Sequence, residues 1–214
     1  MKRPSHMEQI KKRLQSAEDG AVFIPSDFFD IAEAVKINVY LNRLVETNEL
    51  QRVLRGVYAK PRYSELLGKQ VPPRMDDISK AIARSHGWTV VPSGDAALNM
   101  LGLSTQVPAV WLFVSDGPYK AYDADGGRLE FKHTDQKSEV IHVSSKTALV
   151  VQALKALGKG NMTDQDIKRI AKVLTADEKT QMLLEARRVT AWVYERIRRI
   201  CTEDCSSGAF GGME

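Results

Sequence analysis

A helical pattern runs directly into a hairpin pattern in AVKINVYLNRLVETNELQRVLRGVYAK, residues 34–60. Apolar residues recur at helical spacing in its first half, and we expect a helix from about Ala34 to Thr47. Alternating residues then flank Arg55-Gly56, which is typical of two strands joined by a tight turn. This segment is either a surface helix with an ordinary hairpin, or a recognition helix followed by the wing of a DNA-binding domain.

The residues that precede this segment help to choose between the two. Ile10 and Leu14 lie four apart in a charged stretch, which predicts an amphipathic helix. A short apolar strand is expected over 21–24, and a second helix after Pro25 with Ser26 as its N-cap. The order helix, strand, helix, helix, hairpin is the layout of a winged helix-turn-helix, which we predict over residues 1–64.

Several side chains of this domain suit contact with duplex DNA. Asn and Arg can form bidentate hydrogen bonds to base edges, and Lys and Arg neutralise phosphates. A solvated helix face beside a basic hairpin is the ordinary alternative, but the order of the elements favours DNA. The predicted DNA-binding residues are Lys36, Asn38, Asn42 and Arg43 on the helix, and Arg52, Arg55, Lys60 and Arg62 on the hairpin and its exit.

Prolines between residues 61 and 74 indicate a junction, so a second domain is predicted over 65–214. We expect it to be an α/β domain that ends in helices, which makes the whole chain mixed α/β or α+β. Helices are predicted over Met75–Ser85, from Ser93 as N-cap through Leu101, and over 146–157, 163–174 and 177–200. Strands are predicted over Trp88–Val91, Ala109–Ser115, Tyr119–Tyr122, Arg128–Lys132 and Glu139–Val143.

The last predicted helix has an apolar stripe at nearly heptad spacing, which we expect to pack inside the domain. The stripe consists of Met182, Ala186, Val189, Val193, Ile197 and Ile200. Basic residues on this helix and the preceding one are expected to form an exposed face for an acidic or nucleic-acid partner, with a merely solvated face as the alternative. They are Lys168, Arg169, Lys172, Arg187, Arg188 and Arg198.

Composition and motifs favour a binding protein over an enzyme. The 31 Lys and Arg residues against 27 Asp and Glu give a net charge of +4, too mild to identify a polyanionic partner alone. Cys201 and Cys205 have no second pair or nearby His to complete a metal site, and no phosphate-loop, dinucleotide or nucleophile-elbow motif occurs. We therefore expect no cofactor, no metal and no catalytic residue. Without a long apolar run or a secretory signal, a cytoplasmic location and no membrane contact are expected.

Three further segments carry a family resemblance. They are GWTVVPSGDAALNMLGLSTQVPAVWLFVSDG over residues 87–117, GRLEFKH over 127–133, and a helical end with Ala191-Trp192. With the helix-turn-helix and its RGVYAK hairpin, the chain resembles the AbiEi-type antitoxins of type IV toxin-antitoxin systems, in particular the DUF6088 branch.

The resemblance implies a bacterial regulator of an abortive-infection (phage-defence) system. Its winged helix would repress its own operon by binding inverted repeats in the promoter. Its second domain would counteract a co-encoded nucleotidyltransferase toxin of AbiEii type, without needing a stable complex with it.

Two other functions remain open at the level of the sequence. One is a stand-alone winged-helix transcription factor whose second domain senses a ligand or dimerises. The other is a nuclease-like enzyme recruited by the DNA-binding domain, against which stands the lack of a compact carboxylate and lysine cluster. A neighbouring nucleotidyltransferase gene would favour the antitoxin over the first alternative, and metal-dependent cleavage of plasmid DNA would favour the second.

Overall fold

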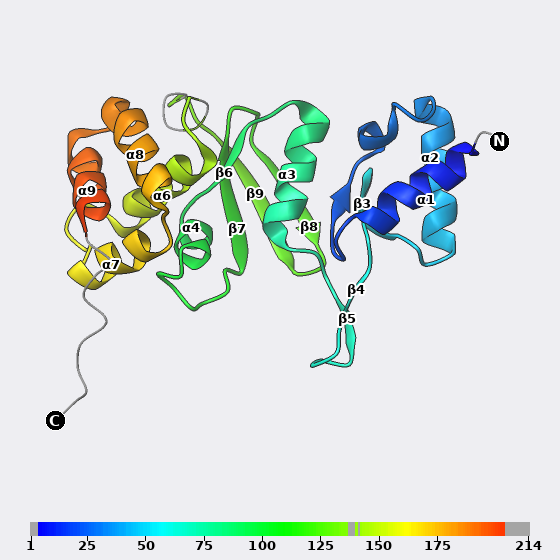
Figure 1. Ribbon diagram of the computed structural model, residues 1–214, viewed down its shortest axis with the longest axis horizontal. Coiled ribbons are helices and arrows are strands. Elements are labelled where there is room, and N and C mark those ends of the chain that lie inside the picture. The colour runs from blue at the N-terminus through cyan, green and yellow to red at the C-terminus, as the bar shows by residue number, and fades with distance from the viewer. Residues whose placement is uncertain (1–3, 137–139, 141, 204–214) are drawn as a thin grey trace. The chain divides into compact units, whose positions relative to one another are not determined.

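The structure is a computed structural model that describes residues 4–136, 140 and 142–203 (Figure 1). Its secondary structure is mixed, with helices and three separate small sheets, so the predicted α+β class is confirmed at this level. Two compact units are present: residues 1–88 with 122–129, and residues 89–121 with 130–214. The domain boundary predicted between residues 64 and 65 stays a prediction.

The first unit begins with three helical elements. α1 (His6–Ser16) has a capping box in which the Ser5 side chain accepts from the Glu8 N–H and the Glu8 carboxylate accepts from the Ser5 N–H. A short 3-10 helix, η1 (Pro25–Phe28), follows, and then α2 (Ala34–Glu46). Ser26 was predicted as an N-cap, but it lies inside η1. Instead the carboxylate of Asp27 accepts a hydrogen bond from the backbone N–H of Ile24, the residue before η1.

These helices pack on an antiparallel sheet of three short strands. The strands are β1 (Val22–Phe23), β2 (Gln51–Leu54) and β3 (Val57–Ala59), in the order β1-β3-β2. Gly56 forms the turn between β2 and β3 with φ of 77°, a conformation that favours glycine. Apolar side chains from the helices, β1 and β3 form one buried core, including Ile10, Phe23, Phe28, Ile37, Leu41, Leu44 and Tyr58.

The segment from residue 62 to residue 88 forms a hairpin and a helix. β4 (Arg62–Ser64) pairs antiparallel with β5 (Lys69–Val71), and the loop between them exposes Leu66 and Leu67. α3 (Met75–His86) follows the paired prolines as predicted and ends at Gly87, which has φ of 69°. α3 lies against β1 and β3 through Arg84, which donates to the carbonyl of Val22 at 3.2 Å.

The third sheet has the strand order β6-β7-β9-β8. Its strands are β6 (Val90–Pro92), β7 (Val110–Ser115), β8 (Lys120–Ala124) and β9 (Gly127–His133), close to four of the predicted strands. α4 (Asp95–Met100) follows β6, but its N-cap is Gly94 with φ of 57°, not Ser93 as predicted. The hydroxyl of Ser93 instead donates to Oε1 of the buried Gln152 at 3.2 Å.

Helices form the end of the second unit. α6 (Ser145–Leu157) and α7 (Asp164–Lys172) confirm two predicted helices, and α8 (Ala176–Glu185), the 3-10 helix η2 (Ala186–Arg188) and α9 (Ala191–Thr202) follow. The single helix predicted over 177–200 is wrong, because Val189 is extended (φ −85°, ψ 171°). α7 and α8 each start with a threonine capping box, Thr163 with Asp166 and Thr175 with Glu178.

The apolar stripe predicted across these helices is buried despite this break. Met182, Ala186, Val193, Ile197 and Ile200 lie in one core, and Val189 packs against it partly buried. The strand predicted over Glu139–Val143 falls partly outside the described residues, and Val140 is helical. None of the helices in the described part of the chain has the length and apolar character needed to cross a bilayer.

Candidate nucleic-acid interface

α2 presents a polar face opposite its buried side. Ile37, Leu41 and Leu44 are buried in the core, and the predicted contact residues on this helix are all exposed: Lys36, Asn38, Asn42 and Arg43. Two valines share this exposed face, Val35 with 75% and Val39 with 44% of its surface accessible. The DNA-contacting residues predicted from the sequence include neither valine. Their spacing of four, out of phase with the buried residues, was the available signal.

A hydrogen bond connects α2 to the β2–β3 hairpin. Nη2 of Arg52 on β2 donates to Oδ1 of Asn42 at 2.6 Å, and the guanidinium lies 5.7 Å from the ring centroid of Tyr58. Both contacts hold the long Arg52 side chain beside the helix. Arg55 is exposed at the tip of the same hairpin. The structure therefore brings Arg52 and the exposed face of α2 together.

Lys60 and Arg62 are engaged elsewhere in the first unit. Nζ of Lys60 forms an ion pair with Asp19 at 2.9 Å and donates to the carbonyl of Ala17 at 2.8 Å. Arg62 is half-buried, and its Nη2 approaches the carbonyl of Pro72 at 3.5 Å. Both residues follow β3 on the β1 side of the sheet, whereas Arg52 lies on β2 at the other edge.

The exposed face of α2 has the chemistry to contact base edges. Asn and Arg side chains donate and accept in the major groove, and an apolar side chain such as Val39 can contact a thymine methyl group. Lys36 and Arg43 carry charges suited to phosphates. Within the described residues, no hydrogen bond or ion pair occupies the side chain of either one, so both are available to a ligand.

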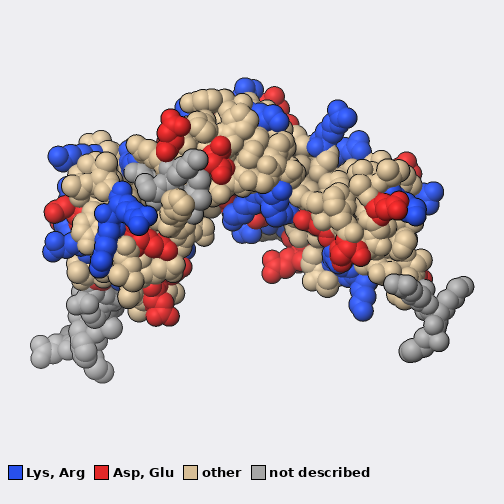
Figure 2. Space-filling view, turned by 90° about the horizontal axis from the view of Figure 1, so that it is seen from above, with Lys and Arg blue, Asp and Glu red and all other residues tan. Residues whose placement is uncertain are grey.

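The basic residues predicted as a partner face in the second unit lie on three elements, α7, η2 and α9, and their acting as one face stays a prediction. Lys168, Arg169 and Lys172 are exposed on α7, whereas Arg187 and Arg188 border a hollow beside His142, Leu184 and Glu185. Arg198 is exposed on α9, beyond the break at Val189. On the face that Figure 2 shows, Lys and Arg side chains are interspersed with Asp and Glu.

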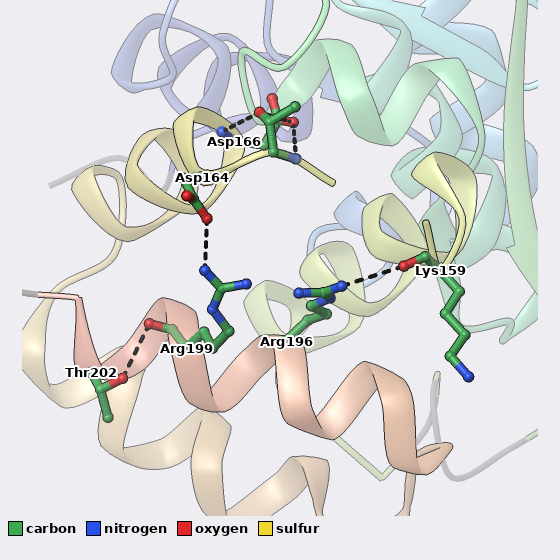
Figure 3. A network of polar contacts seen from close by, with 7 residues as sticks. Lys159, Asp164, Asp166, Arg196, Arg199 and Thr202 are labelled. Carbon is green, nitrogen blue, oxygen red and sulfur yellow. Dashed lines mark hydrogen bonds and ion pairs between the residues drawn. The ribbon is translucent and has the colours of Figure 1, made fainter. Parts of the chain in front are cut away.

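Two other arginines of α9 bind within the unit, as Figure 3 shows. Arg199 forms an ion pair of 2.7 Å with Asp164 at the start of α7, and Arg196 approaches the carbonyl of Lys159 at 3.5 Å. These two cations therefore help to hold α9 against α7 and its preceding loop. The basic face predicted from the sequence includes Arg198 and leaves out Arg196 and Arg199, although neighbouring arginines on a helix carry no signal of which one finds a carboxylate.

Side chains suited to catalysis or metal binding are sparse. Among the described residues, no group of three or more His, Cys, Asp and Glu side chains could hold a metal ion. Burial raises the pKa of the half-buried Cys201 thiol, which disfavours the reactive thiolate. The pKa of His133 is raised, mainly by a hydrogen bond between its ring and the carbonyl of Gly117 and to a smaller extent by one with the carboxylate of Asp135. These contacts suit a structural role.

Comparison with protein families gives one match. A model described as a family of unknown function (DUF6088) matches residues 9–182, which includes α2, the β2–β3 hairpin and most of the second unit. A search of curated proteins finds no match to the chain.

Proposed function

The chain belongs to the DUF6088 family, and we propose that it is a sequence-specific DNA-binding protein whose first unit is a winged helix-turn-helix. In this proposal α2 is the recognition helix and the β2–β3 hairpin is the wing. η1 and α2 then correspond to the two helices of the helix-turn-helix, and in the strand order β1-β3-β2 the hairpin consists of the central strand and one edge strand.

The observation that carries the proposal is the exposed face of α2 together with its link to the hairpin. Polar and cationic side chains occupy that face, and the hydrogen bond of 2.6 Å from Arg52 to Asn42 fixes a wing residue beside them. A merely solvated helix would not need two exposed valines in the same face. Apolar and amide groups side by side are what base edges in the major groove require.

Titration of the full chain with duplex DNA tests this proposal. The DNA upstream of its own gene is compared with a shuffled duplex of the same composition, at low and moderate salt. We expect tighter binding to the upstream DNA and weaker binding to both duplexes at moderate salt, because phosphate contacts release counterions. Equal affinity for the two duplexes, or affinity that salt leaves unchanged, would contradict the proposal.

Autorepression and antitoxin activity rest on the sequence resemblance, and we propose them as the biological role. The matched family description does not speak to either activity. Co-expression with a neighbouring nucleotidyltransferase gene, if one is present, measures protection of growth. A full chain that carries Asn42→Ala and Arg43→Ala separates the two roles. Retained protection by this variant would mean neutralisation independent of the operator, and lost protection would mean that repression carries it.

A further inference from the structure

A cavity of about 380 Å³ opens on the first unit, and no residue of α2 is among the described residues that line it. One side is formed by the segment from Glu18 to Val22, between α1 and β1, and another by α3 with the residue before it. Arg62, on β4, also lines it. The volume lies within the range of natural small-molecule sites.

The cations on the α3 side of the cavity already have carboxylate partners. Nε of Arg74 donates to Asp77 at 2.9 Å, and Nζ of Lys80 lies 2.6 Å from Asp76. Arg84 binds Asp27 at 3.2 Å. These pairs neutralise the wall and hold its side chains in place, so they do not by themselves select an anion.

Arg62 differs from these cations. Among the described residues, no carboxylate oxygen lies within 4.0 Å of its guanidinium. Its Nε atom is buried and has no hydrogen-bond acceptor, and its Nη2 reaches only the carbonyl of Pro72 at 3.5 Å. A buried donor without an acceptor is costly, and a guanidinium offers a fork of donors that matches a phosphate or carboxylate.

Two neighbours of Arg62 shape the site. Gly20 has φ of 86°, a conformation that favours glycine, and a Cβ atom there would be in ordinary van der Waals contact with Cδ of Arg62 at 3.5 Å, so its backbone lies beside the arginine stem. Glu18 also lines the cavity, and no ion pair or hydrogen bond of its side chain is found within the described ranges. The Glu18 carboxylate and the Arg62 side chain therefore belong to the lining of the same cavity.

We infer that this cavity binds a small molecule that carries a phosphate or carboxylate group, with the Arg62 guanidinium as its anchor. Glu18 then accepts a hydrogen bond from an N–H or O–H group of the same molecule. An anion without such a donor should bind less well, because its charge is repelled by the Glu18 carboxylate. The inference gives Arg62 a role different from the DNA contact expected from the sequence, and it does not depend on the proposed DNA binding.

NMR of the full chain measures this binding directly. Each arginine Nε–H gives its own signal, and the Arg62 signal is identified by its loss in Arg62→Gln. The probes are inorganic phosphate, adenosine 5′-monophosphate and succinate, with uncharged adenosine as a control. At a probe concentration of about 10 mM, even a probe with a Kd of about 1 mM occupies most of its sites. We expect a phosphate or carboxylate probe to shift the Arg62 signal more than those of Arg74 and Arg84, and adenosine to leave it unchanged.

Affinity of the variants gives a second measurement. Arg62→Gln should weaken binding of the best probe by about tenfold or more, since a charge-assisted hydrogen bond is lost. Arg62→Lys keeps the charge without the fork and should give an intermediate loss. Lys69→Gln, an exposed lysine on β5, is the charge-matched control and should leave the affinity unchanged.

The outcomes decide between an anion site and its alternatives. A shifted Arg62 signal with a selective loss in Arg62→Gln supports the site, and the stronger probe identifies a phosphate or a carboxylate ligand. No shift with any probe would overturn it and would leave Arg62 satisfied by water. Equal losses in Arg62→Gln and Lys69→Gln would also overturn it, because surface charge alone would then explain the binding. The NMR measurement on the unaltered chain decides the question even where a variant does not fold.

Discussion

Nη2 of Arg52 and Oδ1 of Asn42 lie 2.6 Å apart, which joins a strand of the hairpin to the helix that we propose reads DNA. The bond occupies one acceptor site of Asn42 and leaves its amide N–H groups as donors. It also orients the amide before any DNA arrives. Asn42 and Arg52 therefore form a unit, and the consequences of changing either should depend on the other.

A double-mutant cycle on operator affinity tests this unit. Asn42→Ala and Arg52→Ala should be non-additive by about 1 kcal/mol, because residues in direct contact share their interaction energy. Asn42→Ala with Arg55→Ala is the matched control and should be additive, since no bond joins this pair. An additive Asn42 and Arg52 pair would mean that the hydrogen bond has no part in DNA binding.

We expect residues of α2 to read bases and the residue at the hairpin tip to contact phosphates, so substitutions in the two places should have different effects. Asn38→Ala should cost about 1–3 kcal/mol on the operator and much less on unrelated DNA. Arg55→Ala should weaken both duplexes and lower the slope of log affinity against log salt by about one unit. Lys159→Ala, in the second unit, controls for the loss of one charge. The same pattern for Asn38→Ala and Arg55→Ala would contradict the assignment of helix and wing.

Glu185 should stabilise the second unit in a pH-dependent way. Burial raises the pKa of its carboxyl, but hydrogen bonds from Thr147, Ser144 and Gln181 outweigh burial and leave the pKa below its usual value. A lowered pKa contributes stability at neutral pH that is lost as the pH falls below the usual glutamate pKa and through the folded one.

We expect Glu185→Gln to reduce the free energy of unfolding by about 1–2 kcal/mol near pH 7. The difference from the unaltered chain should shrink as the pH falls towards about 3, because protonation of the carboxylate, first in the unfolded and then in the folded chain, removes its contribution. Urea unfolding at the two pH values measures it. Glu195→Gln, an exposed glutamate on α9, is the control. A difference that stays constant with pH would mean that the charge of Glu185 does not stabilise the unit.

Burial should decide the effect of truncating apolar residues on α8. Met182 is fully buried in the helical core, so Met182→Ala should lower the free energy of unfolding by about 2–5 kcal/mol. Leu184, two residues later in the same helix, is 58% exposed. Leu184→Ala should therefore change the free energy of unfolding by less than about 0.5 kcal/mol. Calorimetric or denaturant unfolding compares the two. Similar losses of stability in the two variants would contradict the orientation of α8, in which Met182 faces the core and Leu184 faces solvent.

Local patterns predicted most of the helices, because their boundaries lie in nearby residues. α2 has its buried residues at helical spacing, and α3 ends at a glycine. The break at Val189 could not be predicted in the same way, since Met182, Ala186 and Val193 keep helical spacing across it and contact one core. Apolar spacing alone does not distinguish one long helix from two helices that pack on the same side.

The candidate site was predictable in part. The exposed residues of α2 follow from their phase relative to Ile37 and Leu41. The partners of Lys60 and Arg62 did not follow, because each depends on residues distant in the chain or on a backbone carbonyl. Asp19 lies far from Lys60 in sequence, and only the pairing of β1 with β3 brings them together. Counting cations in a segment cannot show which of them are already paired.

The threonine capping boxes of α7 and α8 have a consequence for how the helical end folds. Thr163 with Asp166 and Thr175 with Glu178 each define a helix start through contacts three residues apart. Such short-range contacts close at little loop entropy, so both starts can form before the core is assembled. We therefore expect the registers of α7 and α8 to be restricted early in folding, before Ile167, Ile170 and Met182 pack into their common core.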